Sequence, residues 1–132
     1  MTLDNEDNRP LRTQKGANGL SNDTCASVDA GICGFVCRIK ARKIDKRTVG
    51  LEISESECLQ IQDFAEQLRQ LSLDEIFMPL TRNPVYLAAE KSGCHPSCPI
   101  PAAVLKAAEV AMEMALARDA SIRFEPCTRK MI

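Results

Sequence analysis

Two stretches of alternating apolar and polar residues, joined by a short polar link, constrain the fold of this chain more than any other feature. The first covers residues 35–42 and the second residues 49–53, with Asp45, Lys46 and Arg47 between them. The apolar positions are Phe35, Cys37, Ile39 and Ala41 in the first stretch and Val49, Leu51 and Ile53 in the second. A period of two places successive side chains on opposite faces of a strand. The pattern therefore predicts an antiparallel hairpin with one buried face and one solvated, largely basic face.

Signals for helices follow the hairpin. Ser54 and Glu57 have the spacing of a capping box and precede apolar residues at helical intervals, which predicts a helix over residues 56–71. Ser72 and Glu75 repeat the capping signature, so we expect a second, short helix there.

The rest of the chain predicts two further helices and a last strand. Asn83 and Gly93 frame one helix as its cap and its end, and Pro101 opens a longer, mostly apolar one. Ile122 and Phe124 alternate with polar neighbours, which is typical of a strand. The expected fold is a two-layer α+β domain in which three antiparallel strands, in the order ββαααβ, pack against helices.

The chain of 132 residues divides into one domain and two tails. Residues 1–29 carry few apolar side chains and show no steady period, so we interpret them as a flexible polar tail. The predicted domain covers residues 30–126, and residues 127–132 form a C-terminal tail. A domain of about a hundred residues is long enough to bury one core.

Charge and hydropathy exclude several classes of function. The 17 basic and 18 acidic residues give a net charge of -1, so no overall field would attract nucleic acid. The longest apolar stretch, residues 101–117, contains Lys106, Glu109 and Glu113 and is too polar to cross a membrane unaided. The N-terminus lacks the apolar core of a secretory signal, so we expect a cytoplasmic protein.

Cysteine is the residue type that indicates chemistry in this sequence. Seven cysteines accompany a single histidine and no tryptophan. Reducing conditions in the cytoplasm disfavour disulfides, so the excess of thiols points to metal binding or thiol chemistry. Cys94 and Cys98 lie in a proline-bearing loop between two helices, where a spacing of three residues lets two thiolates chelate one ion.

The predicted fold brings two further cysteines toward that loop. Cys98 precedes the helix that Pro101 opens, and Cys58 falls in the first turn of the helix after the hairpin. Cys33 stands at the open end of the hairpin, next to the point where the second strand leaves toward Cys58. The sequence therefore predicts one metal site. Its ligands are Cys33, Cys58, Cys94 and Cys98, and its occupant is either zinc or an iron–sulfur cluster.

The same cysteines carry a resemblance to known proteins. Cys33 and Gly34 precede a strand, Cys58 follows the next strand, and residues 94–99 precede a helix. This arrangement resembles the TSCPD-type domain of cobalamin-dependent ribonucleotide reductases and, more distantly, iron–sulfur scaffold proteins. Residues 31–125 also resemble an uncharacterised family of small four-cysteine proteins from anaerobic acetogens and methanogens. The resemblance implies a four-thiolate site at the same cysteines and supplies no reaction.

Two other classes of function stay open beside a binding or cluster-transfer role. A thiol-redox enzyme would use Cys94 or Cys98 as its nucleophile, activated by the adjacent helix start and by His95. An adaptor would use the basic face of the hairpin or the last helix to bind a protein, and that helix could also form a homodimer.

The remaining thiols have simpler interpretations. Cys37 shares a strand face with Phe35 and Ile39, so we expect a small core residue that is at most a reserve ligand. Cys25 and Cys127 lie near the ends of the chain and are expected to be exposed thiols without a role in the site.

Overall fold

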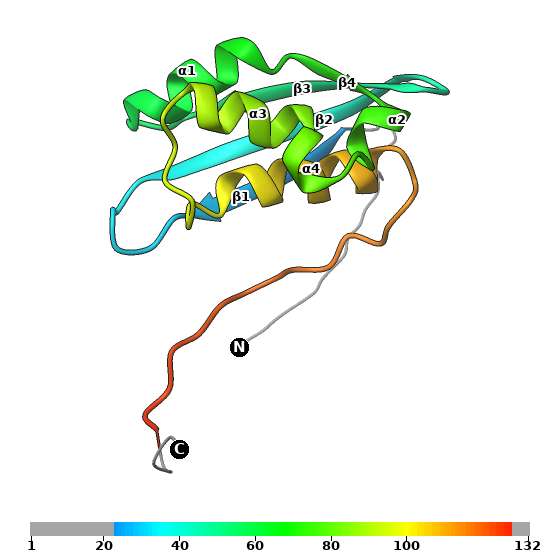
Figure 1. The fold of residues 1–132 in the computed structure, drawn as a ribbon. Helices are drawn as coiled ribbons and strands as arrows, with labels where there is room; N and C mark the ends of the chain where they lie inside the picture. Colours follow the sequence, from blue (N-terminus) through cyan, green and yellow to red (C-terminus); the bar gives the residue numbers. More distant parts are fainter. Residues whose placement is uncertain (1–22, 128–132) are drawn as a thin grey trace.

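A computed structural model describes residues 23–127, in which four antiparallel strands form one sheet (Figure 1). The strands are β1 (Thr24–Asp29), β2 (Val36–Asp45), β3 (Thr48–Ser54) and β4 (Gln70–Ser72), and they lie side by side in that order. The helices are α1 (Leu59–Gln67), α2 (Leu73–Ile76), the short 3-10 helix η1 (Leu80–Arg82), α3 (Pro84–Lys91) and α4 (Ile100–Ala111). The helices pack on one face of the sheet, so the architecture is a two-layer α+β fold.

The predicted hairpin is confirmed as β2 and β3. Ile39 pairs with Ile53 and Ala41 pairs with Leu51 across the two strands. The inward-facing positions of β2 are buried, whereas the basic positions between them are exposed. Alternation in the sequence therefore reports which face of this hairpin meets the helices.

The prediction of three strands in the order ββαααβ is wrong, because the sheet has four strands. Strand β1 lies in a segment that we assigned to the N-terminal tail, and its residues are small or polar, which hides the alternation. Strand β4 has only three residues, too few for a periodic signal. The last strand, predicted around Ile122 and Phe124, does not form, and both side chains are exposed. The rest of the predicted N-terminal tail, residues 1–22, lies outside the described residues, as do residues 128–132.

Helix α1 is shorter than the predicted span of residues 56–71. It begins after Cys58, which is its N-cap, so the expected capping box at Ser54 is not the start of the helix. At the other end, Leu71 is buried and pairs with Val49 across β3 and β4. Burial of Leu71 in the sheet thus outweighs the helical spacing that it shares with the residues before it.

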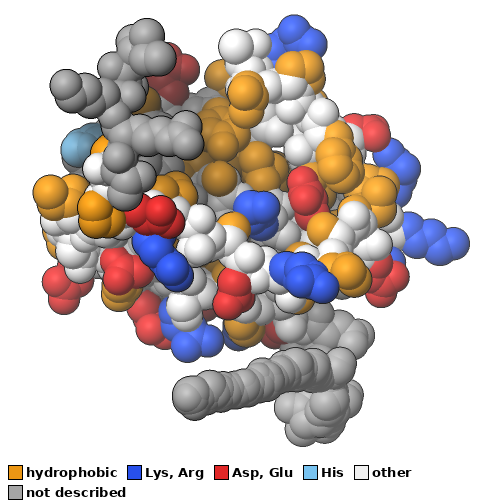
Figure 2. All heavy atoms as spheres, turned by 90° about the horizontal axis from the view of Figure 1, so that it is seen from below, with side chains coloured by type: hydrophobic (Ala, Val, Ile, Leu, Met, Phe, Trp, Pro, Cys, Tyr) orange, Lys and Arg blue, Asp and Glu red, His pale blue; other side chains and the backbone are white. Residues whose placement is uncertain are grey.

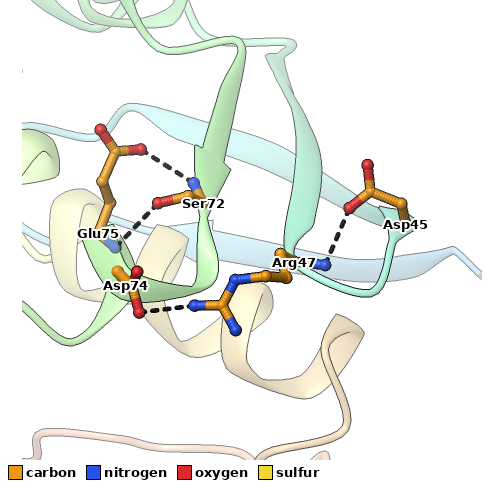
Figure 3. A network of polar contacts seen from close by, with 5 residues as sticks. All are labelled: Asp45, Arg47, Ser72, Asp74 and Glu75. Carbon is orange, nitrogen blue, oxygen red and sulfur yellow. Dashed lines mark hydrogen bonds and ion pairs between the residues drawn. The ribbon is translucent and has the colours of Figure 1, made fainter.

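The capping box at Ser72 and Glu75 is confirmed and fixes the start of α2 (Figure 3). The backbone N–H of Glu75 donates to Ser72 Oγ at 3.1 Å, and the N–H of Ser72 donates to Glu75 Oε1 at 2.9 Å. Arg47, in the turn between β2 and β3, donates to Asp74 Oδ1 at 2.7 Å, and its backbone N–H donates to Asp45 Oδ1 at 2.9 Å. These contacts hold α2 against the turn at one end of the sheet.

Asn83 caps α3, as the sequence predicts, and also connects it to α2. Its Oδ1 accepts a hydrogen bond from the N–H of Val85 at 2.9 Å, and the residue is buried. Its Nδ2 donates to the carbonyl oxygens of Glu75, Ile76 and Met78 at 3.1–3.3 Å. A buried amide whose donors and acceptor are satisfied in this way fixes the position of α3.

Helix α4 packs against β1 and β2 through small and branched side chains. Val104 and Ala108 are fully buried, and Pro101 occupies the first turn, where its missing N–H costs no hydrogen bond. A homodimer through this helix stays a prediction. Within residues 23–127, no helix combines the length and the apolar character needed to cross a membrane.

Charged side chains of both signs are interspersed with apolar ones on the face of the molecule seen from below (Figure 2). This mixture agrees with the net charge of -1. A surface of this kind produces no extended field of one sign on that face.

Candidate metal centre

Three connections between secondary-structure elements meet at one end of the sheet, on the left in Figure 1. They are the loop between β1 and β2, the entrance to α1, and the loop between α3 and α4. These connections carry the four predicted ligands Cys33, Cys58, Cys94 and Cys98. The capping box of α2 lies at the opposite end of the hairpin.

Cys33 lies in a tight loop whose backbone conformation depends on two glycines. Gly31 and Gly34 flank it with φ angles of 91° and 75°, values that other residues rarely adopt. The N–H of Gly34 donates to the carbonyl of Gly31 at 2.8 Å, and the N–H of Gly31 donates to Asp29 Oδ1 at 2.9 Å. The side chain of Cys33 is exposed at the tip of this loop.

Cys58 occupies the N-cap position of α1 rather than its first turn, which corrects the prediction. Its thiol is half-buried and donates to Gln60 Oε1 at 3.3 Å. Its backbone N–H donates to Ser56 Oγ at 3.2 Å. The sulfur is thus held at the entrance of the helix by contacts on both sides.

Cys94 and Cys98 are positioned by the end of α3 and by a turn. Gly93 has a φ of 75° and ends the helix, and the N–H of Cys94 donates back to the carbonyl of Ala89 at 2.9 Å. The N–H of Cys98 donates to the carbonyl of His95 at 3.0 Å, which closes a four-residue turn. A Cβ placed on Gly93 would stand 3.9 Å from Cγ of Gln60, so this loop lies against the start of α1.

Cys94 lies close enough to other ionisable groups to respond to their charges. Burial and, to a smaller extent, negative charge on Cys98, Cys58 and Asp63 together raise its pKa from 9.0 to about 11. Cys58 and Asp63 both belong to the α1 region. The electrostatics therefore agree with the packing of the α3–α4 loop against that helix.

Charge interactions link Cys98 to several of the other thiols. Burial raises its pKa, the backbone N–H of Ile100 lowers it in part by hydrogen bonding, and charges on Cys33 and Cys58 raise it. Cys37, buried at the start of β2, has its pKa raised to about 11 by burial and by the charge of Cys98. Five of the seven cysteines thus interact electrostatically around Cys98.

The thiols are neighbours, yet they do not surround one point. Within residues 23–127, no three side chains of His, Cys, Asp or Glu come close enough together to hold a metal ion. Four sulfurs around one zinc ion would lie roughly 4 Å from each other. The residue types fit a thiolate site, and closing it would require the sulfurs to move together, so the four-ligand site stays a prediction.

A pocket of about 280 Å³ lies beside the α3–α4 loop. Its lining is Tyr86, Ala89, Glu90, Cys94, His95, Pro96, Cys98 and Pro101. Tyr86 and Glu90 carry no motif of their own in the sequence, although they stand four residues apart on α3 and therefore share a helix face. Cys94 and Cys98 form part of the wall, so a small molecule in the pocket could approach the thiols.

The raised thiol pKa values predict how the stability of the metal-free protein depends on pH. Because Cys37 and Cys94 keep their protons to about pH 11 when folded, the unfolded chain releases protons first as the pH rises above 9.0. We therefore expect full stability below pH 9 and a progressive loss between pH 9 and 11, measured by urea unfolding. The Cys37→Ala variant should lose less over that interval than the wild type. Equal pH dependence of the two proteins would contradict the assignment.

Residues 24–124 match a family described as Family of unknown function (DUF6951). The chain belongs to this family. No curated protein and no solved structure matches the chain. The DUF6951 match begins at the first residue of β1 and includes the four predicted ligands. Within the described residues, the family match therefore covers the sheet, the helices and the four predicted ligands, and its description gives no function.

Proposed function

We propose that this protein binds a metal centre, zinc or an iron–sulfur cluster, through Cys33, Cys58, Cys94 and Cys98. The observation that carries the proposal is that the three connections bearing these cysteines meet at one end of the sheet (Figure 1). Packing of the core does not require this arrangement, because Cys33 is exposed and the other three are only half-buried. Half-exposed thiols gathered in this way suit metal binding better than core filling.

The mutual electrostatics of the thiols support a cation as their partner. The pKa values of Cys94 and Cys98 are raised first by burial and also by negative charge on neighbouring thiols, which makes ionisation of the group harder. A bound cation removes this penalty and stabilises the thiolates, so metal binding would release protons. Protonated thiols carry no charge. In that state no bound cation attracts the Cys33 loop toward the other three cysteines.

The same pKa values disfavour the alternative of a thiol-redox enzyme. A thiol acts as a nucleophile through its thiolate, and catalytic cysteines generally have a lowered pKa. The pKa of Cys94 is raised to about 11, and that of Cys98 is also raised. His95 is exposed, so it does not share the buried environment of a paired catalytic base. Metal binding is accordingly the better account of these residues.

The reducing cytoplasm is the compartment that we propose for the protein. All six cysteines at positions 25–98 and Cys127 are free thiols in the structure. Free thiols in this number persist where glutathione and thioredoxin keep them reduced. The same environment supports the loading of thiolate metal centres.

Purification without oxygen, followed by metal and sulfide analysis and an absorption spectrum, tests the proposal. Brown protein with equal amounts of iron and acid-labile sulfide would support a cluster, and colourless protein with one zinc per chain would support a zinc site. Stably folded protein that takes up neither metal, as isolated or after reconstitution, would refute metal binding. A single fast-reacting thiol in such a protein would favour the enzyme instead.

A further inference from the structure

Residues 113–127, which we call the C-terminal arm, expose an unusual amount of apolar surface. Every residue of the arm is exposed, and the exposed fractions of Leu116, Ile122 and Phe124 are 80%, 85% and 96%. Burial of side chains of this size is favourable, so their exposure to water is unfavourable in an isolated chain. Figure 1 shows the arm, in orange and red, running away from the sheet and helices.

A defined turn directs the arm away from α4. Glu113 has a φ of 65°, and its N–H donates to the carbonyl of Val110 at 3.0 Å. The N–H of Met114 donates to the carbonyl of Glu109 at 2.8 Å. This pair of hydrogen bonds is the usual ending of a helix by a left-handed residue. The departure of the arm is therefore built into the end of the helix.

Strand β1 offers an edge that the arm could complete. Within the described residues β1 pairs with β2 alone, so the backbone groups along its other side have no strand partner. Its inward-facing residues Ala26 and Val28 pack against the core but are only partly buried. An edge strand with unpaired backbone groups accepts another strand readily.

We propose that the C-terminal arm of one chain adds a fifth, antiparallel strand to β1 of a second copy, and that the second copy returns the same contact. Ile122 and Phe124 would then cover Val28 and Ala26, and the polar residues between them would face solvent. Reciprocal exchange of identical arms closes a two-fold dimer and leaves neither arm nor edge unpartnered. The family match starts at Thr24 and ends at Phe124, so it contains the edge strand β1 and residues 113–124 of the arm.

The length of the chain argues for a second copy rather than the chain's own edge. Lys43 Nζ lies 3.9 Å from Glu113 Oε1, which places the start of the arm near the beginning of β1. Antiparallel pairing with its own β1 would require the arm to travel about 20 Å along that strand and then reverse. Residues 114–120 span at most about 25 Å when extended, which leaves almost no chain for the reversal. Pairing with β1 of a second copy does not require the arm to reverse direction within these residues.

Charge is also complementary in this register. When Ile122 lies opposite Val28, Glu125 lies opposite Cys25 on the outer face. Cys25 pairs with Lys40 of β2, so the carboxylate of Glu125 approaches the basic row of that strand. The outer side chains of β1 at this point are small, which leaves room for the approach.

Measurement of mass by light scattering after gel filtration tests the dimer. We expect the wild type to be a dimer, and the double variant I122S/F124S to be a monomer that stays folded, as a retained cooperative thermal transition would show. The matched control is Leu80→Ser, which removes an apolar side chain that is 70% exposed on η1, and it should remain a dimer. A wild type that is monomeric at all concentrations, or a dimer that survives I122S/F124S, would overturn the proposal.

Cross-linking tests the register. In a Cys127→Ser background, Glu125→Cys places a thiol opposite Cys25, and mild oxidation should join the two chains between positions 125 and 25. The same protein with Cys25→Ser should not form this link, and neither should Ser121→Cys, which lies opposite Asp29. A link between positions 125 and 25 within a single chain would show that the arm folds onto its own β1 and would refute exchange.

Discussion

The Cys98→Ser variant is expected to lose metal affinity by at least about 100-fold. Cys98 is one of the four proposed ligands, and charge interactions link it to Cys33, Cys37, Cys58 and Cys94. Loss of a residue that only orients a ligand typically costs 10–100-fold in affinity, and loss of a ligand itself should cost more. Titration of zinc against a chromogenic chelator measures the change, and iron and sulfide content after reconstitution measures it for a cluster.

The control for this experiment is Cys127→Ser, which removes an exposed thiol from the C-terminal arm and should leave affinity unchanged. Cys37→Ala provides a second comparison, because this buried thiol neighbours Cys98 but is not one of the four proposed ligands. Wild-type metal affinity in Cys98→Ser would contradict a metal site in the α3–α4 loop. Equal losses in Cys98→Ser and Cys37→Ala would instead add Cys37 to the ligands.

The Phe64→Ala variant is expected to destabilise the protein by about 3–5 kcal/mol. Phe64 lies on α1, has no exposed surface and is the largest side chain in the centre of the core. Its removal deletes buried apolar surface and leaves a cavity that the surrounding helices can fill only in part. The free energy of unfolding, measured in urea on metal-free protein, gives the loss directly.

Leu59→Ala on the same helix is the matched control. Leu59 is 75% exposed, so its truncation should change stability by no more than about 0.5 kcal/mol. Similar losses in the two variants would contradict the assignment of the Phe64→Ala loss to buried packing, because alanine lowers the helix propensity at neither position.

The sequence predicts those elements whose signals are local. The β2–β3 hairpin follows from strict alternation, and the starts of α2 and α3 follow from Ser72 with Glu75 and from Asn83. Strand β1 could not be predicted in the same way, because its inward-facing residues Thr24, Ala26 and Val28 include only one strongly apolar side chain. That strand exists because β2 supplies hydrogen-bonding partners along its whole length, which is a tertiary cause.

The candidate site also depends partly on local sequence signals and partly on tertiary packing. The spacing of Cys94 and Cys98 and the geometry of a hairpin suffice to predict that three connections meet at one end of the sheet. The proximity of Cys37 to Cys98 depends on how α4 packs on β2, which no local pattern reports. The pocket beside Tyr86 and Glu90 depends on the same packing.

The sequential order of the strands has a consequence for biosynthesis. Each strand lies beside its neighbour in the chain, and contacts of this local kind favour rapid folding. On the ribosome the sheet and α1 can therefore assemble while the segment that carries Cys94 and Cys98 is still being made. Two of the four proposed ligands would then emerge before the other two, so the proposed metal centre could be completed only after α3 and the loop that follows it are made.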